Sequence, residues 1–200
     1  MTASNDLRGR FCVFTGSRHG ARQEYADAAR ALAHELVERQ YGLVYGGGNV
    51  GLMGVVADEV LRLGGHVTGV IPDRLVKKEV AHKGLSELCV VGSMHERKAM
   101  MAELSDGFIA MPGGIGTMEE FFEVLSWAQL AIHSKPCALL NAGSYYDHLV
   151  QFIDHAVQHD FLKPKHRALL MVEEDPAKLL DHFEAFLETH ATKRFDPART

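Results

Sequence analysis

The sequence lacks the features of several protein classes. It has 26 Asp and Glu against 21 Lys and Arg, a formal net charge of -5. A nucleic-acid-binding protein needs concentrated basic side chains to replace the counterions of the phosphate backbone, so we expect no nucleic-acid partner. No apolar run reaches the roughly 18–20 residues of a membrane-spanning helix, so we expect no membrane partner. The first ten residues are polar and lack the apolar centre of a signal peptide.

Cysteine is scarce as well. The three cysteines, Cys12, Cys89 and Cys137, each lie in a short apolar run that is typical of a strand. An odd number of thiols in buried strands does not suit a disulfide framework and favours a reducing compartment. We therefore expect free, buried thiols and a cytoplasmic protein.

Two common catalytic motifs are missing. The chain has 12 His, but it has no His-Glu-x-x-His motif and no two cysteines at zinc-site spacing. His155 and His159 share one helix face at a spacing of four residues, which is a weak argument for a metal ion. The Gly-x-Ser-x-Gly turn of serine hydrolases is absent too. We therefore predict neither a metal site nor a Ser-His-Asp hydrolase.

What the sequence does have is an alternation of short apolar runs and amphipathic segments. The predicted strands are 10–17, 41–45, 66–71, 87–91, 107–111, 137–140 and 169–172, and the predicted helices are 25–38, 50–63, 94–104, 117–131, 145–159 and 176–187. Residues 73–84 are polar and irregular. Alternating strands and helices form βαβ units around a parallel sheet, which is apolar on both faces. We predict one Rossmann-like, doubly wound α/β domain over residues 1–200. It would have about six to seven strands, helices on both faces and frayed ends at 1–9 and 193–200.

Three predicted strand-to-helix connections are unusually rich in glycine: 15–20, 46–54 and 112–120. In a doubly wound sheet, ligands bind beyond the carboxyl ends of the strands, near the point where the strand order reverses. The first segment is equally compatible with an ordinary loop. The second is compatible with a tight turn that packs a helix on the sheet. For each of these two segments, we therefore keep both interpretations, a ligand-binding turn and a purely structural connection.

The third segment, Pro-Gly-Gly-Ile-Gly-Thr, is the strongest candidate site. It follows a predicted buried strand and leads into a helix. Gly113, Gly114 and Gly116 leave backbone N–H groups unobstructed, and Thr117 can cap the helix and offer its hydroxyl. A helix N-terminus carries free N–H donors and partial positive charge, so it favours an anion. We therefore predict a phosphate-binding turn.

The charged residues near this turn allow two interpretations each. Arg97 lies near the start of the predicted helix 94–104, where a positive charge opposes the helix dipole. It either forms a surface ion pair with Glu96 or Glu103, which would contribute little, or it faces the anion site. Glu119 and Glu120 fall in the first turn of the next helix, where they either complement the dipole or take part in chemistry.

Together, these segments resemble the LONELY GUY (LOG) family of cytokinin riboside 5′-monophosphate phosphoribohydrolases. The family pattern Pro-Gly-Gly-x-Gly-Thr-x-x-Glu matches 112–120, Gly-Gly-Gly-x-x-Gly-Leu-Met-Gly matches 46–54, and Met-His-x-Arg-Lys matches 94–98. The likeness extends over about residues 11–161. It departs in the first turn, where the family commonly has Cys-Gly-Ser-Ser and this chain has Thr-Gly-Ser-Arg. Arg18 there changes the contacts open to a nucleobase or a phosphate.

The resemblance implies an enzyme that hydrolyses the N-glycosidic bond of a purine nucleoside 5′-monophosphate. The base would be adenine or an N6-modified adenine, and the products would be the free base and ribose 5-phosphate. Arg97 and Glu120 would be catalytic, and no metal or organic cofactor would be needed. The implied substrate-binding residues are Ser17, Asn49, Glu79, Met94, Lys98, Gly113, Gly114, Gly116 and Thr117. Cytokinin production and nucleotide salvage both remain open as roles.

The resemblance also implies a homodimer whose site borrows residues across the interface. The apolar helix around Trp127 is a candidate interface, although ordinary core is an equal interpretation. Two other functions stay open. A nucleotide or molybdenum-cofactor carrier of the same fold would bind phosphate without cleaving anything, but it would not require the pair Arg97 and Glu120. A lysine decarboxylase would need a pyridoxal-binding lysine in a much larger enzyme.

Overall fold

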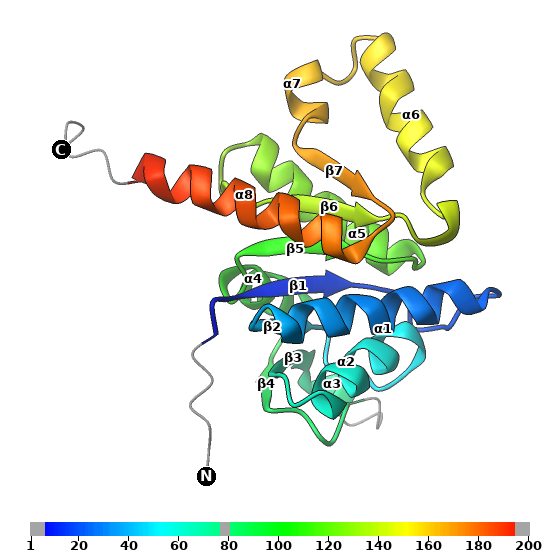
Figure 1. Ribbon diagram of the computed structural model, residues 1–200, viewed down its shortest axis with the longest axis vertical. Coiled ribbons are helices and arrows are strands. Elements are labelled where there is room, and N and C mark those ends of the chain that lie inside the picture. Colours follow the sequence, from blue (N-terminus) through cyan, green and yellow to red (C-terminus); the bar gives the residue numbers. More distant parts are fainter. Residues whose placement is uncertain (1–6, 77–80, 195–200) are drawn as a thin grey trace.

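A computed structural model describes residues 7–76 and 81–194 of the chain. The described residues contain seven strands in one parallel sheet, with the order β4-β3-β2-β1-β5-β6-β7 (Figure 1). In chain order, the elements are β1 (Gly9–Phe14), α1 (Gln23–Glu38), β2 (Tyr41–Tyr45), α2 (Gly51–Arg62), β3 (Val67–Pro72), α3 (Asp73–Val76), β4 (Glu87–Val91), α4 (Met94–Glu103), β5 (Gly107–Ala110), α5 (Ile115–Gln129), β6 (Cys137–Leu140), η1 (Ala142–Ser144), α6 (Asp147–Gln158), α7 (Pro164–Arg167), β7 (Leu170–Glu173) and α8 (Pro176–Arg194).

Helices cover both faces of the sheet, which explains why its central strands are apolar on both sides. Leu32 of α1, Val56 of α2 and Phe183 of α8 share one core with side chains of the central strands. Met101 of α4 and Phe121 of α5 belong to the core on the opposite face, together with side chains of α6. In Figure 1, α1, α2 and α8 lie in front of the sheet and α4 and α5 lie behind it. The predicted Rossmann-like α/β architecture, with six to seven strands, is therefore confirmed.

Several local predictions were wrong at the edges of the fold. The short helix α3 lies within the segment predicted to be irregular. Strand β4 is the edge of the sheet, and its Leu88 and Val90 side chains are 39% and 55% exposed, so this strand is not apolar on two covered faces. Cys89 on the same strand is only half-buried, whereas Cys12 and Cys137 are buried as predicted, and all three are free thiols.

The chain is also ordered further out than the predicted frayed ends. Gly9 already belongs to β1 and pairs with Tyr41 of β2. The Arg8 N–H donates to the Gln40 carbonyl at 3.0 Å, and the Arg8 guanidinium pairs with Glu184 of α8 at 2.8 Å. Helix α8 extends to Arg194, well beyond the predicted end near residue 187. Residues 1–6 and 195–200 lie outside the described part. Within that part, no helix is long and apolar enough to cross a membrane.

Candidate active site

Three connections meet at the point where the strand order reverses. Strand β1 pairs in parallel with β2 on one side and with β5 on the other, so the turns after these three strands lie together at the carboxyl ends of the strands. The Gly16 N–H donates to the Pro112 carbonyl at 3.1 Å, and the Leu52 N–H donates to the Gly16 carbonyl at 3.0 Å. The glycine-rich segments singled out in the sequence are thus hydrogen-bonded into one unit at the place where doubly wound folds bind ligands.

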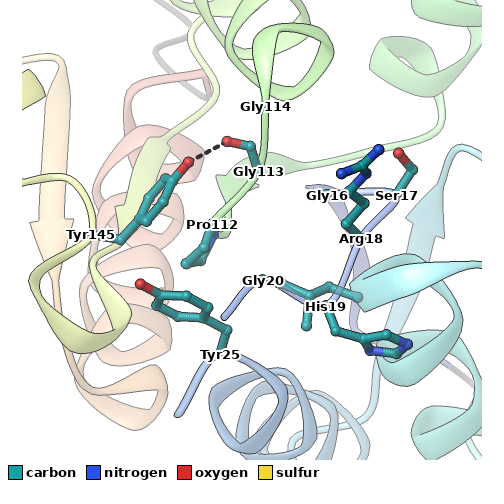
Figure 2. A pocket seen from close by; sticks show the side chains of 11 residues that line it. Gly16, Ser17, Arg18, His19, Gly20, Tyr25, Pro112, Gly113, Gly114 and Tyr145 are labelled. Carbon is teal, nitrogen blue, oxygen red and sulfur yellow. Dashed lines mark hydrogen bonds between the residues drawn. The ribbon is translucent and has the colours of Figure 1, made fainter. Parts of the chain in front are cut away.

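A cavity of about 350 Å³ opens between these turns (Figure 2). The turns after β1 and β5 form much of its wall, and Tyr25 of α1 and Tyr145, which follows β6, close one side. Its lining is Gly16, Ser17, Arg18, His19, Gly20, Tyr25, Leu52, Pro112, Gly113, Gly114 and Tyr145. Of the residues predicted to bind substrate, the cavity therefore collects Ser17, Gly113 and Gly114.

The start of α5 forms the part of this site suited to an anion. Gly114 is the N-cap, and its carbonyl accepts the first helical bond, from the Met118 N–H at 3.1 Å. The N–H groups of the three residues before Met118 therefore have no acceptor inside the helix. The prediction that Thr117 caps the helix was wrong, because Thr117 lies within the first turn and is only 4% exposed.

The glycines of this turn fall into two kinds. A Cβ on Gly113 would overlap the Thr117 side chain and lie 2.9 Å from the Gly16 nitrogen, so close packing requires glycine there. At Gly114 and Gly116, in contrast, an added Cβ would meet no described atom within 4 Å, and neither residue has a positive φ. The fold alone does not require glycine at these two positions. Their glycines instead suit the close approach of a ligand to the backbone.

Arg97 of α4 and Glu120 of α5 form a buried ion pair. The Arg97 Nη2 lies 3.2 Å from the Glu120 Oε1, and the two side chains are only 11% and 12% exposed. A Cβ on Gly46 would overlap the Arg97 guanidinium, so the glycine run after β2 makes room for this side chain. Arg97 also contacts the Met94 sulfur at 3.8 Å, and its Nε has no hydrogen-bond partner among the described residues. The surface ion pair considered for Arg97 is therefore ruled out.

Glu120 lies close to the helix start but does not line the cavity. It is four residues beyond Gly116, which places both on one face of α5, about one helical turn (5.4 Å) apart. Burial raises the pKa of the Glu120 carboxyl above its ordinary value, and the nearby Arg97 charge opposes that rise. The pair thus holds a carboxylate in a poorly solvated place, an arrangement often found at catalytic sites.

Lys98 has a different environment from its neighbour Arg97. Its ammonium lies 2.6 Å from a Glu119 carboxylate oxygen and 3.0 Å from one of Glu123. The hydrogen bond that Lys98 donates to Glu119 raises the Lys98 pKa, and the contact with Glu123 adds to this rise, while partial burial opposes it. This cluster joins α4 to α5 on the side of the helices that also carries the buried pair. Glu119 thus binds Lys98, whereas Glu120 is paired with Arg97.

The remaining predicted residues are placed less decisively. Asn49 is exposed in the turn after β2, and Met94 is 40% exposed. Glu79 lies outside the described residues. On α5, Phe121 is buried, whereas its neighbour Phe122 is 36% exposed.

Arg18, His19 and Gly20 line the cavity and lie in the segment 15–20 that the sequence offered as a candidate connection. The sequence reasoning missed two cavity residues, Tyr25 and Tyr145. They belong to a helix start and to a distant loop that carry no glycine motif, so no local signal could have found them.

A metal site has little support among the described side chains. The rings of His155 and His159 lie 4.2 Å apart on α6, as their spacing predicts. Within the described part of the chain, they have no third ligating side chain close by. His34, Glu35 and Glu38 do approach one another near the C-terminal end of α1, and none of them lines the cavity. Exposed acidic groups of this kind are common without a metal ion.

Two solved structures have the same architecture. The molybdenum cofactor binding protein from the phototrophic bacterium Rippkaea orientalis aligns over 90% of this chain and 97% of its own, with a TM-score of 0.69 and 20% identity. The Moco carrier protein from Chlamydomonas reinhardtii aligns over 90% and 98%, with a TM-score of 0.66 and 19% identity. At this low identity, the likeness demonstrates a shared fold only.

Sequence comparisons identify much nearer relatives. Residues 53–183 match the family model described as "Possible lysine decarboxylase". The rice protein (Oryza sativa subsp. japonica) named "Probable cytokinin riboside 5′-monophosphate phosphoribohydrolase LOGL9" is 53% identical, over 89% of this chain and 78% of its own. The Arabidopsis thaliana cytokinin riboside 5′-monophosphate phosphoribohydrolase LOG5 is 51% identical, over 88% and 78%. The chain therefore belongs to the LOG family of cytokinin riboside 5′-monophosphate phosphoribohydrolases.

Proposed function

We propose that the protein is an enzyme that hydrolyses the N-glycosidic bond of a purine nucleoside 5′-monophosphate, with adenine or an N6-modified adenine as the base. One observation carries the proposal. A buried carboxylate, Glu120, is paired with Arg97 one helical turn beyond a helix start whose glycines leave room for a ligand. The names of relatives at about half identity over most of the chain support the same reaction.

The substrate phosphate would bind at the start of α5. The free N–H groups there and the partial positive charge of the helix end attract an anion. Gly114 and Gly116 let the phosphate oxygens reach the backbone, and the Ser17 hydroxyl is available from the turn after β1. The phosphate is remote from the bond that breaks, so its binding energy can be used to hold the sugar in a reactive position.

Bond cleavage would take place near Glu120. The bond between C1′ of the ribose and the base nitrogen breaks, and its electron pair leaves with the base. Water adds to C1′, and a proton from that water ends on the base. Positive charge develops on the sugar in the transition state, as in other glycoside hydrolyses. The Glu120 carboxylate would stabilise this charge and orient the water or the ribose hydroxyls.

Arg97 would act on both the carboxylate and the substrate. Its positive charge favours the ionised form of the buried Glu120, which burial alone would disfavour. Its charge would also position the substrate or offset negative charge on the leaving base. Lys98 is held by two carboxylates, so we assign it to positioning α5 rather than to direct substrate contact. Asn49 and Met94 remain proposed pocket residues, as does Glu79.

The test is release of free base from AMP and from isopentenyladenosine monophosphate, which also distinguishes plain from N6-prenylated substrates. We expect Glu120→Gln and Arg97→Ala to lower the rate of base release by about 100-fold or more. This is the lower end of the range found when an acid–base group is lost. Glu119→Gln is the matched control, because it neutralises the adjacent carboxyl in the same helix and should keep most activity. Normal turnover by Glu120→Gln would refute the assignment.

A carrier function is the alternative, and the same assay separates the two. Tight binding of the nucleotide with no release of base would favour a carrier. The solved carriers share only the fold with this chain, so they add no weight to that alternative.

We further propose that the chain forms a homodimer in the cytoplasm. Leu130 and Ile132, just beyond the end of α5, are 67% and 65% exposed. They adjoin a second cavity of about 550 Å³ that Trp127 helps to line, so the end of α5 is the candidate interface. Light scattering on the purified protein, with Ile132→Glu as the disrupting variant, tests this assignment. A wild-type mass equal to one chain would refute it.

A further inference from the structure

Tyr145 contacts the phosphate turn from across the cavity. Its hydroxyl donates a 2.6 Å hydrogen bond to the carbonyl of Gly113 (Figure 2). The tyrosine follows the short helix η1 after β6, so it reaches the turn from a part of the chain 32 residues away. Gly113 is the residue immediately before the N-cap of α5. The hydrogen bond therefore acts on the peptide that begins the anion-binding turn.

This contact fixes the direction of one backbone donor. The peptide between Gly113 and Gly114 is planar, with its C=O and N–H pointing in opposite directions. Figure 2 shows Tyr145 on one side of Gly113, and Ser17 and Arg18 on the other. With the carbonyl turned towards Tyr145, the Gly114 N–H points to the side of Ser17 and Arg18.

The same contact keeps a second donor free. If α5 were extended by one residue at its start, the Gly113 carbonyl would accept the Thr117 N–H, four residues further on. That carbonyl is held by the Tyr145 hydroxyl instead. With the carbonyl turned towards Tyr145, no hydrogen bond from the Thr117 N–H to Gly113 is present among the described residues, and that N–H can serve a ligand. Without this contact, the conformational freedom of glycine would allow the peptide to turn.

Tyr145 is itself held firmly. Its ring packs edge-to-face on Tyr25 at 5.6 Å and on Tyr146 at 4.9 Å between ring centroids. The Tyr146 hydroxyl donates to the Met111 carbonyl, and the Tyr146 N–H donates to the Asn141 side chain at 2.6 Å. These contacts anchor the loop after β6 to the strand end from which the turn departs, so the hydroxyl of Tyr145 has a fixed position.

We propose that Tyr145 is a positioning residue for the substrate phosphate. It sets the orientation of the Gly113–Gly114 peptide and so presents the backbone donors to the anion, without contacting the reacting atoms. This inference rests on the proposed function, because it assumes that the anion is the 5′-phosphate of the substrate.

The test is Tyr145→Phe, which removes the hydroxyl and keeps the ring. We expect KM for AMP to rise about three- to tenfold, the range for loss of one net hydrogen bond, with kcat changed less than twofold. The dissociation constant for ribose 5-phosphate, measured by calorimetry, should rise by the same factor. Cleavage of adenosine, which has no phosphate, should be unaffected by the substitution.

Tyr41→Phe is the matched control. It also removes one tyrosine hydroxyl, but Tyr41 is buried at the start of β2, the end of the strand opposite to the turns, so it should leave KM unchanged. An unchanged KM in Tyr145→Phe, or an equal rise in KM in Tyr41→Phe, would overturn the proposal. If the wild-type protein releases no base, the proposed function fails. The ribose 5-phosphate measurement then still tests Tyr145 by itself.

Discussion

Replacing Gly116 with alanine separates what the fold requires from what a ligand requires. Gly116 is the second residue of α5, and an added Cβ would meet no described atom within 4 Å. Its backbone is not in the left-handed region, so alanine fits without strain. Such a substitution reduces the freedom of the unfolded chain and stabilises by about 0.4–1 kcal/mol. For a chain of this size, Tm should rise by about 1–4 °C.

Activity should change in the opposite direction. The new methyl group would stand at the helix start, where the proposed phosphate approaches the free N–H groups. Displacing the phosphate by a fraction of an ångström misaligns the sugar with Glu120. We therefore expect kcat/KM for AMP to fall by about 10- to 100-fold, as small misplacements at active sites do.

The assay measures Tm and base release on the same preparation of Gly116→Ala. Gly64→Ala is the control, because a Cβ on Gly64 also meets open space but the residue has a φ of +82°. Alanine in that conformation costs about 1–2 kcal/mol, so Tm should fall while activity stays unchanged. A lowered Tm in Gly116→Ala would refute the packing argument. A raised Tm with unchanged kcat/KM would refute the approach of a ligand at this glycine.

Three further predictions follow from single side chains. Lys98→Met leaves Glu119 and Glu123 without their shared cation, so urea unfolding should show a loss of about 1–3 kcal/mol. Because burial raises the Glu120 pKa, kcat/KM should fall with falling pH at a midpoint above the ordinary 4.5, and a midpoint at or below it contradicts this. A raised pKa also means that folding favours the protonated Glu120. The free energy of unfolding of the wild type should therefore fall, relative to that of Glu120→Gln, as pH rises through this midpoint. Arg39→Met removes the ion pair between Arg39, at the end of α1, and Asp181 of α8, so it should lower Tm and leave activity unchanged.

The sequence was a good guide to the sheet and to the turns at its edge. Buried parallel strands read as apolar runs, and the turns after β2 and β5 carry glycines in numbers that ordinary connections do not need. Helix ends without stop signals were harder to predict. Helix α8 extends to Arg194 because no glycine or proline interrupts the segment after residue 187. The position of β4 as the outermost strand of the sheet could not be predicted either, because β4 has the composition of a covered strand.

The wall of the cavity opposite the turns could not be predicted for a different reason. Tyr145 reaches Gly113 only because β6 lies next to β5 in the sheet, and pairing order is not encoded in any local pattern. Lys98 illustrates the same limit. Its position in the Met-His-x-Arg-Lys motif suggests a ligand contact, but in the structure its ammonium donates hydrogen bonds to Glu119 and Glu123. Motif membership alone does not separate residues that touch substrate from those that hold its neighbours.

Three features near the start of α5 each lower the stability of the protein. Glycine at Gly116 forgoes helix propensity worth up to about 1 kcal/mol. Burying Arg97 and Glu120 as a pair removes two charges from water, and apolar side chains of similar volume are often no less stable in such places. The Arg97 Nε adds a buried donor without a partner among the described residues. A phosphate bound beside Gly116 and a sugar with developing positive charge beside Glu120 would compensate the first two costs. Their coincidence within about one turn of α5 is therefore better explained by catalysis than by folding.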